Sequence, residues 1–131
     1  MNGTVWDPLR KKEVALTPEE EVRQWFIAVL KDSVGVPEHQ MMSEVELPSG
    51  PAGKAYRADI VIYGPGGRRL GIVECKRPEV KITAAVMEQA QRYSALLEVP
   101  YIFVTNGPAT YVFCNGRQLN ALPAYAEMKT I

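Results

Sequence analysis

Apolar residues recur every three to four positions after Thr17, which is the spacing of one buried face of an α-helix. That face comprises Val22, Trp25, Phe26, Val29 and Leu30. Thr17 can cap the helix, Pro18 suits its first turn, and the acids that follow favour the positive end of its dipole. The pattern therefore predicts a helix over residues 17–33, ended by Gly35 and Pro37.

Short runs rich in Ile, Val and aromatic residues predict extended strands in the rest of the chain. These runs cover residues 41–47, 58–63 (ADIVIY), 70–76 (LGIVECK), 101–105 and 110–114. Shorter strands are expected at 13–16 and, after the Asn115-Gly116 turn, in RQLNAL. The sequence GPGGRR between ADIVIY and LGIVECK is a hairpin signal, and PSGPAG at 48–53 reads as a loop.

A second helix is predicted over residues 82–98, with Val86, Ala90, Tyr93 and Leu97 on one face. Helices then alternate with strands in the order helix, three strands, helix, two strands. This order favours an α/β fold with a mixed sheet and helices packed on it. With 131 residues the chain reads as a single domain, with an N-terminal arm (1–16), a core (17–116) and a C-terminal extension (117–131).

The composition, 47% hydrophobic and 23% charged, excludes a disordered or collagen-like chain. Fifteen basic residues balance fifteen acidic ones, but they are unevenly distributed. Residues 13–46 hold eight acids and two bases, whereas residues 54–81 hold seven bases and three acids. The middle of the chain is therefore basic, as expected where phosphates are contacted.

The two cysteines cannot form a disulfide scaffold, and each lies in an apolar run, so both read as free thiols of a reducing compartment. The N-terminus has no apolar signal-peptide core. Residues 99–116 are free of charge but are interrupted by prolines and Asn106-Gly107, which indicates strands rather than a membrane helix. A cytoplasmic protein without membrane contact is the expectation.

Three charged residues, Asp59, Glu74 and Lys76, lie on the two hairpin strands. If Gly66-Gly67 form a two-residue turn, the register places Asp59 directly across from Glu74, with Cβ atoms about 4.5–5.5 Å apart. Lys76 then points to the same face, and Cys75 points to the core. Two carboxylates this close repel, and a hard divalent cation with oxygen ligands would offset both charges.

Asp59 followed by Glu74-Cys75-Lys76 resembles the signature of PD-(D/E)XK nucleases, with Ala58 in place of the usual proline. QAQRY in the second helix resembles the QxxxY motif of the RecB-like branch. Together with DPLRKK, ALTPEEEVRQ, RADIVIY, IVECKRP and FVTNG, it resembles the N-terminal nuclease domain of type I restriction-enzyme R subunits (HsdR N-terminal-like), most of all small stand-alone bacterial relatives. The resemblance covers roughly residues 5–116 and implies a restriction-endonuclease-like αβββαβ core.

The resemblance also implies roles for single residues. Asp59, Glu74 and the backbone carbonyl of Cys75 would ligate Mg²⁺ or Mn²⁺, and Lys76 would activate the attacking water and stabilise the developing charge. An acid of the first helix would face the site. Glu19 and Glu20 are both candidates, and the helical face favours Glu19 slightly.

Gln89 and Tyr93 share a helix face and, by the same resemblance, would lie beside the site and help to place the lysine or the DNA. Arg57, Arg77 and Lys81 are candidate phosphate contacts. The sequence lacks a GxxxxGK[ST] loop, so no ATP motor is expected in it.

The expected function is a Mg²⁺-dependent DNA endonuclease domain of a restriction-modification system. Two alternatives stay open: a catalytically silent module that binds DNA or protein, and a nuclease acting on RNA or branched DNA. Nothing in the sequence reads base edges, so targeting would come from a protein partner or from self-association.

Overall fold

The computed structural model describes residues 3–48 and 55–131, so nearly all of the loop predicted over 48–53 lies outside the described residues. Its main sheet has six strands in the order β3-β4-β5-β6-β7-β8, in which β5 and β6 are parallel and the other neighbouring pairs are antiparallel. The strands are β3 (Met41–Pro48), β4 (Ala55–Tyr63), β5 (Arg69–Cys75), β6 (Tyr101–Thr105), β7 (Thr110–Cys114) and β8 (Arg117–Gln118). The predicted α/β fold with a mixed sheet is confirmed.

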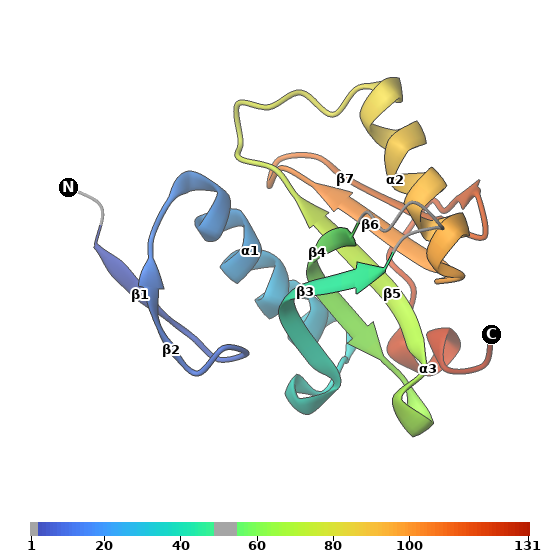
Figure 1. Cartoon of the computed structure of the whole chain (residues 1–131), viewed down its shortest axis with the longest axis horizontal. Helices are drawn as coiled ribbons and strands as arrows, with labels where there is room; N and C mark the ends of the chain where they lie inside the picture. The colour runs from blue at the N-terminus through green and yellow to red at the C-terminus, as the bar shows by residue number, and fades with distance from the viewer. Residues whose placement is uncertain (1–2, 49–54) are drawn as a thin grey trace.

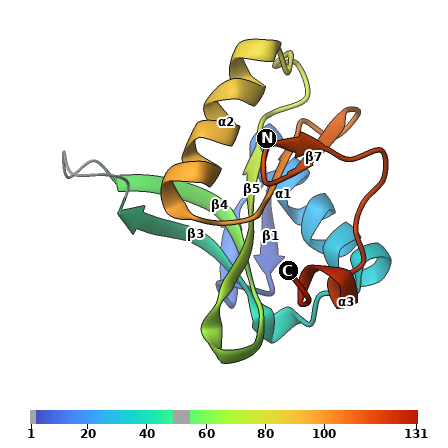
Figure 2. The ribbon, with the colours of Figure 1, turned by 90° about the vertical axis from the view of Figure 1, so that its right-hand side faces the viewer.

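Two helices cover opposite faces of this sheet (Figures 1 and 2). Helix α1 (Pro18–Val29) buries Phe26 against Phe103, and α2 (Ala84–Leu97) packs Ala90 in a second cluster with Ile72 and other residues of the opposite face. No helix in the described part of the chain is long and apolar enough to cross a membrane.

Both predicted helices form where the apolar spacing placed them, but Trp25, predicted on the buried face of the first, is 46% exposed, whereas Ile27 is buried. Thr17 caps α1 by accepting a hydrogen bond from the Glu20 N–H (3.1 Å). The helix continues as a π-helical turn (η1, Leu30–Val34) and ends at Gly35, whose φ of 88° is a left-handed conformation that glycine adopts readily. A 3₁₀ turn (η2, Glu38–Gln40) leads into β3.

The hairpin between β4 and β5 differs from the predicted two-residue turn. The turn contains three residues, Pro65–Gly67 (η3), closed by a hydrogen bond from the Gly64 N–H to the Arg68 carbonyl (2.7 Å). A bulge then shifts the register by one residue, so that Ile62 pairs with Gly71. The longer turn and the bulge cancel, and the strands reach the register that a two-residue turn would have given.

The two ends of the chain are more structured than an arm and an extension. The N-terminal residues form a hairpin of β1 (Thr4–Asp7) and β2 (Lys12–Ala15) beside α1, as Figure 1 shows. At the other end, α3 (Tyr125–Met128) buries Met128 completely in the core under α1, and the Tyr125 hydroxyl donates to the Tyr63 carbonyl (2.7 Å). The core therefore extends beyond residue 116, which the weak periodicity of this segment did not indicate.

Candidate functional site

The central strands β4 and β5 separate at the predicted site. Their ladder ends at the pair Ile60 and Val73, so Asp59 and Glu74 are the next residues on the two strands. The Cys75 N–H donates to Asp59 Oδ2 at 2.7 Å. A carboxylate thus takes the place of a backbone acceptor where the ladder ends, and it is fixed beside Glu74.

The two carboxylates share a poorly solvated environment. Burial raises the pKa of Asp59 to about 6, against the lowering effects of the Cys75 N–H and the Arg23 guanidinium, and Glu19 and Glu74 raise it further. Burial also raises the pKa of Glu74, although Lys76 acts in the opposite direction. Each carboxylate is therefore costly to ionise without an additional cation, which is the electrostatic condition that favours metal binding.

Lys76 follows β5 and is fixed by the neighbouring strand β6. Its backbone N–H donates to the Thr105 carbonyl (2.8 Å). Next in the chain, the buried Asn106 side chain donates to the Val80 carbonyl (2.9 Å) and accepts from the Ala109 N–H (2.8 Å). The Thr105-Asn106-Gly107 motif, whose role the sequence did not reveal, thus fastens the segment that carries Lys76 to the β6–β7 turn. Cys75 is buried in the core, as the alternation of side chains predicted.

Glu19 and Glu20 lie in different environments. The Glu19 side chain is 47% exposed and raises the pKa of both Asp59 and Glu74, so it lies close enough to act on the site. The Glu20 side chain is 7% exposed, and its two oxygens accept hydrogen bonds from Arg10 (2.7 Å) and Gln24 (3.0 Å). The geometry favours Glu19 as the helix acid and gives Glu20 a structural role in a buried network of charged residues.

This difference predicts effects of very different size for two neighbouring substitutions. Glu20→Gln should lower the free energy of unfolding by about 3 kcal/mol, because it breaks a buried ion pair. Glu19→Gln should change it by no more than about 0.5 kcal/mol, as is usual at an exposed position. Urea unfolding of the two variants measures both values, and equal losses would show that the two glutamates are not distinguished in this way.

The predicted pair on α2 lies on the outer side of the site. Gln89 is exposed, and both residues line a small cavity of about 130 Å³. Tyr93 stacks on Tyr56 of β4 with ring centroids 4.3 Å apart. Tyr56 was not predicted: it is 6% exposed, and its pKa is raised by burial and by the nearby Glu74 and Asp59. Tyr93 therefore approaches the carboxylates through Tyr56.

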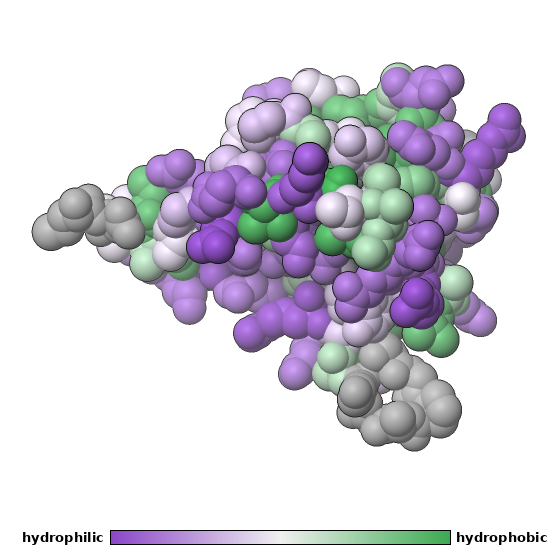
Figure 3. All heavy atoms as spheres, turned by 90° about the horizontal axis from the view of Figure 1, so that it is seen from above, coloured by the Kyte–Doolittle hydropathy of each residue, from purple (hydrophilic) through white to green (hydrophobic). Residues whose placement is uncertain are grey.

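The three predicted phosphate contacts are all on the surface. Arg57 is exposed on β4, and Lys81 is exposed in the loop that leads to α2. Arg77 is 59% exposed and pairs with Glu79 at 3.4 Å, a contact that contributes little to stability. Figure 3 looks onto the end of the molecule where this loop lies and shows hydrophilic side chains around hydrophobic patches.

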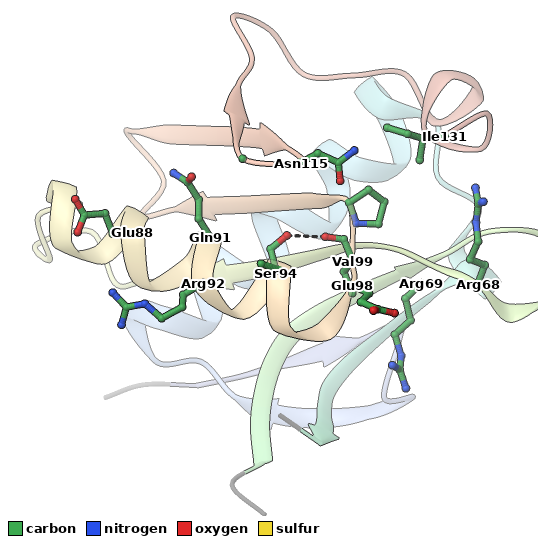
Figure 4. Close-up of a pocket in the computed structure, with 13 residues that line it drawn as sticks. Arg68, Arg69, Glu88, Gln91, Arg92, Ser94, Glu98, Val99, Asn115 and Ile131 are labelled. Carbon is green, nitrogen blue, oxygen red and sulfur yellow. Dashed lines mark hydrogen bonds between the residues drawn. The ribbon is translucent and has the colours of Figure 1, made fainter. Parts of the chain in front are cut away.

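A cavity of about 760 Å³ lies away from these residues, between the C-terminal half of α2 and the β4–β5 hairpin. Its lining includes Arg68, Arg69 and Arg92, but Figure 4 shows these side chains directed apart, without a common point. Because its hairpin residues stand at the opposite end of β5 from Glu74, the cavity is separate from the carboxylate site.

The donor set suits a magnesium ion that keeps part of its water shell. In the described ranges, no three His, Cys, Asp or Glu side chains group closely enough to hold a metal. Mg²⁺ at phosphate-processing sites commonly takes one or two carboxylates, with water and substrate oxygens completing its shell. Asp59 and Glu74 can supply these two carboxylates, and the Cys75 carbonyl stays a predicted third ligand.

Three comparisons relate the chain to known proteins. A family model described as "Type I restriction enzyme R protein N terminus" matches residues 18–131. The Escherichia coli type I restriction enzyme EcoAI endonuclease subunit is 42% identical over 50 residues, which are 38% of this chain and 6% of that protein.

A solved structure described as a fragment of an HsdR subunit of a type I restriction enzyme from Vibrio vulnificus YJ016 superposes with a TM-score of 0.68 at 20% identity. The match covers 88% of this chain and 25% of the Vibrio chain. This similarity shows the fold, and the chain spans a small part of the length of both relatives.

Proposed function

Because the chain belongs to the family of type I restriction enzyme R protein N-termini, we propose that it is a Mg²⁺-dependent DNA endonuclease domain with its site at Asp59, Glu74 and Lys76. Members of this family are parts of restriction endonuclease subunits, which agrees with hydrolysis of phosphodiester bonds. The activity resides in the fold described here and needs no ATP motor within residues 1–131.

Each residue has a task that its position permits. Asp59 and Glu74 would hold the ion with the Cys75 carbonyl, and Mg²⁺ bound there would polarise phosphoryl oxygens and acidify a water ligand. Lys76 presents its ammonium beside Glu74, where it can orient the attacking water and stabilise negative charge on the phosphoryl group. Glu19 adds a carboxylate from α1 that can accept a hydrogen bond from a water molecule.

The observation that carries this proposal is the hydrogen bond from the Cys75 N–H to Asp59 (2.7 Å). It holds an acidic side chain at the end of a ladder, next to a second acidic side chain, with a lysine two residues further on. An ordinary solvated strand edge gives no reason for partly burying two carboxylates side by side. A site that binds a cation and a phosphate does give a reason for placing these charges together.

Conversion of supercoiled plasmid DNA tests the proposal. The protein should nick or linearise the plasmid with millimolar Mg²⁺ and stop when EDTA is added. Absence of Mg²⁺-dependent products at micromolar protein, with a correctly folded sample, would overturn the proposal.

A catalytically silent binding module is a second candidate, because an internal cation already lies beside Asp59. Arg23 Nη2 is 3.4 Å from Asp59 Oδ1, and this guanidinium partly neutralises the carboxylate without a metal. The two candidates differ in their response to Mg²⁺. An ion that binds only the folded protein raises its melting temperature, whereas a silent module gives no rise.

DNA is the proposed substrate, held mainly through its phosphates. Arg57, Arg77 and Lys81 are exposed on one stretch of basic sequence, and phosphate contacts carry no sequence information. Such binding is weak, with dissociation constants typically of about 10⁻⁴–10⁻⁶ M at physiological salt. Targeting would therefore come from a protein partner or from self-association, in keeping with the much longer relatives.

We expect slow cleavage by the isolated chain with little sequence preference. With three phosphate contacts, the logarithm of the binding constant should fall with the logarithm of salt concentration with a slope of about −3. Sequencing the ends produced from a long mixed-sequence substrate measures the preference. Ends confined to one short motif would mean that a base-reading surface exists.

A further inference from the structure

The N-terminal hairpin is joined to the site by a network of charged residues. Arg10, in the turn between β1 and β2, contacts three carboxylates with three different nitrogens. Its Nε donates to the fully buried Asp7, its Nη1 to Glu44 of β3 (2.5 Å) and its Nη2 to Glu20 of α1 (2.7 Å). One guanidinium thus fastens the hairpin to both α1 and β3.

A second arginine faces the same two glutamates from the side of the site. Arg23 Nε is 3.7 Å from Glu20, and Arg23 Nη1 is 3.8 Å from Glu44. Both nitrogens are buried and lack a hydrogen-bond partner within the described residues. The glutamate oxygens nearest to them are already bonded to Gln24 and Arg10, so these glutamates attract Arg23 without binding it closely.

The remaining Arg23 nitrogen points toward the proposed metal ligand. Arg23 Nη2 donates to Asp59 Oδ1 at 3.4 Å, and the Cys75 N–H holds the other oxygen of Asp59. Arg23 is 5% exposed, which leaves it little freedom to adopt another arrangement. Its position therefore fixes which way the Asp59 carboxylate is turned.

The backbone is strained at the same point. Glu44 has φ of 54°, a left-handed conformation that is uncommon for a residue other than glycine. It lies opposite Asp59, between the pairs Ser43–Ile60 and Val45–Ala58. Such strain persists where the surroundings impose it, and it gathers at functional sites. The side chain of this strained residue accepts the hydrogen bond from Arg10.

We propose that Arg10 and Arg23 are positioning residues for Asp59, and that the N-terminal hairpin is therefore part of the site. Arg10 holds Glu20 and Glu44, these two place Arg23, and Arg23 turns the Asp59 carboxylate. The matched family region begins at residue 18, although the DPLRKK motif that contains Arg10 is part of the family resemblance in the sequence. The consequence for cleavage rests on the proposed nuclease function, whereas the network itself does not.

Cleavage kinetics of the full chain test the consequence. Arg10→Gln should lower kcat by about 10²-fold, the cost of a small misplacement of a catalytic group, with KM nearly unchanged. Arg10→Lys should fail to restore kcat, because an ammonium cannot span three carboxylates as the guanidinium does. Arg117→Gln, an exposed change on β8, is the matched control and should behave as the wild type.

Glu44→Gln provides a milder break in the network if Arg10→Gln folds poorly, because the Glu44 side chain is 32% exposed. It should lower kcat in the same direction as Arg10→Gln. Equal kcat for Arg117→Gln, Arg10→Gln and Glu44→Gln, in samples shown to be folded, would overturn the proposal.

A second measurement is independent of cleavage. In urea unfolding, Arg10→Gln and Asp59→Asn should shift the midpoint non-additively, although their side chains do not touch. Additivity should return when Arg23→Gln is present in every variant. Additive shifts of the unfolding midpoint with Arg23 intact would contradict the proposed coupling of Arg10 to Asp59, even if the wild type cleaves DNA. If the wild type does not cleave DNA, the proposed nuclease function is wrong. The unfolding midpoints alone then test whether Arg10 and Asp59 are coupled through Arg23.

Discussion

Asp59→Asn should reduce Mg²⁺-dependent cleavage by at least about 10³-fold and remove the rise in melting temperature caused by Mg²⁺. The substitution preserves an acceptor for the Cys75 N–H but removes one of the two acidic ligands. Electrostatic stabilisation of a transition state commonly accounts for about 10²–10³-fold per group, and loss of the ion adds to this. Cleavage rates and melting curves with and without Mg²⁺ measure the two effects.

The same substitution should stabilise the metal-free protein at neutral pH. Burial raises the pKa of Asp59 from 3.8 to about 6, so the folded state disfavours the charged form. The free-energy penalty for ionising Asp59 in the folded state is absent below about pH 4. It grows as the pH rises to about 6 and is complete above that pH. Two pKa units correspond to about 3 kcal/mol, and because this net shift already includes the attraction to Arg23, Asp59→Asn should gain up to about 3 kcal/mol.

Urea unfolding between pH 4 and pH 8 measures this gain. The wild type should lose stability as the pH rises through this window, and Asp59→Asn should lose less. The charges facing Asp59 are Arg23 and Glu19 from α1 and Glu74 from β5. A lower stability of Asp59→Asn at pH 7 would show that the pair with Arg23 outweighs burial.

Lys76→Ala should lower kcat by about 10²–10³-fold while the melting response to Mg²⁺ remains. The ammonium is not a metal ligand, and its loss removes the positive charge beside Glu74 without removing a carboxylate. Lys76→Arg should also have a low kcat, because a planar guanidinium presents its charge with a different geometry.

Lys31→Ala is the matched control for Lys76→Ala. It removes an exposed ammonium that pairs with Glu38 at 2.7 Å, and it should leave kcat unchanged. A Lys76→Ala protein that cleaves at the wild-type rate would remove lysine from the proposed chemistry. A Lys76→Ala protein without a Mg²⁺ response would show instead that Lys76 supports the metal site.

The local pattern of the sequence predicted the elements that depend on regular periodicity. Helix α1, the central strands and the inward direction of Cys75 follow from apolar spacing and alternation, because burial of one face determines them. The pairing of Ile60 with Val73 was predicted correctly, although the predicted two-residue turn was wrong. The extra turn residue and the bulge compensate for each other. The extra residue at the bulge, Leu70, is fully buried, and sequence spacing does not encode a bulge at this position.

What the sequence did not predict depends on contacts between distant residues. Arg10 and Glu44 are 34 positions apart, and no local motif links a turn of the N-terminal hairpin to β3. The stacking of Tyr56 on Tyr93 likewise arises from the placement of α2 over β4. Helical spacing favoured Glu19 over Glu20 only slightly, because the pairing of Glu20 with Arg10 joins two different elements and leaves no local pattern.

A crystal structure with Mn²⁺, in which anomalous scattering locates the ion, tests the central claim most directly. We predict a peak between Asp59 and Glu74, with carboxylate oxygens of both and the Cys75 carbonyl as ligands and water in the remaining positions. Asp59→Asn crystals soaked in the same way should lack it. No peak at saturating Mn²⁺, with Arg23 still beside Asp59, would contradict the assignment of this site as a metal-dependent nuclease.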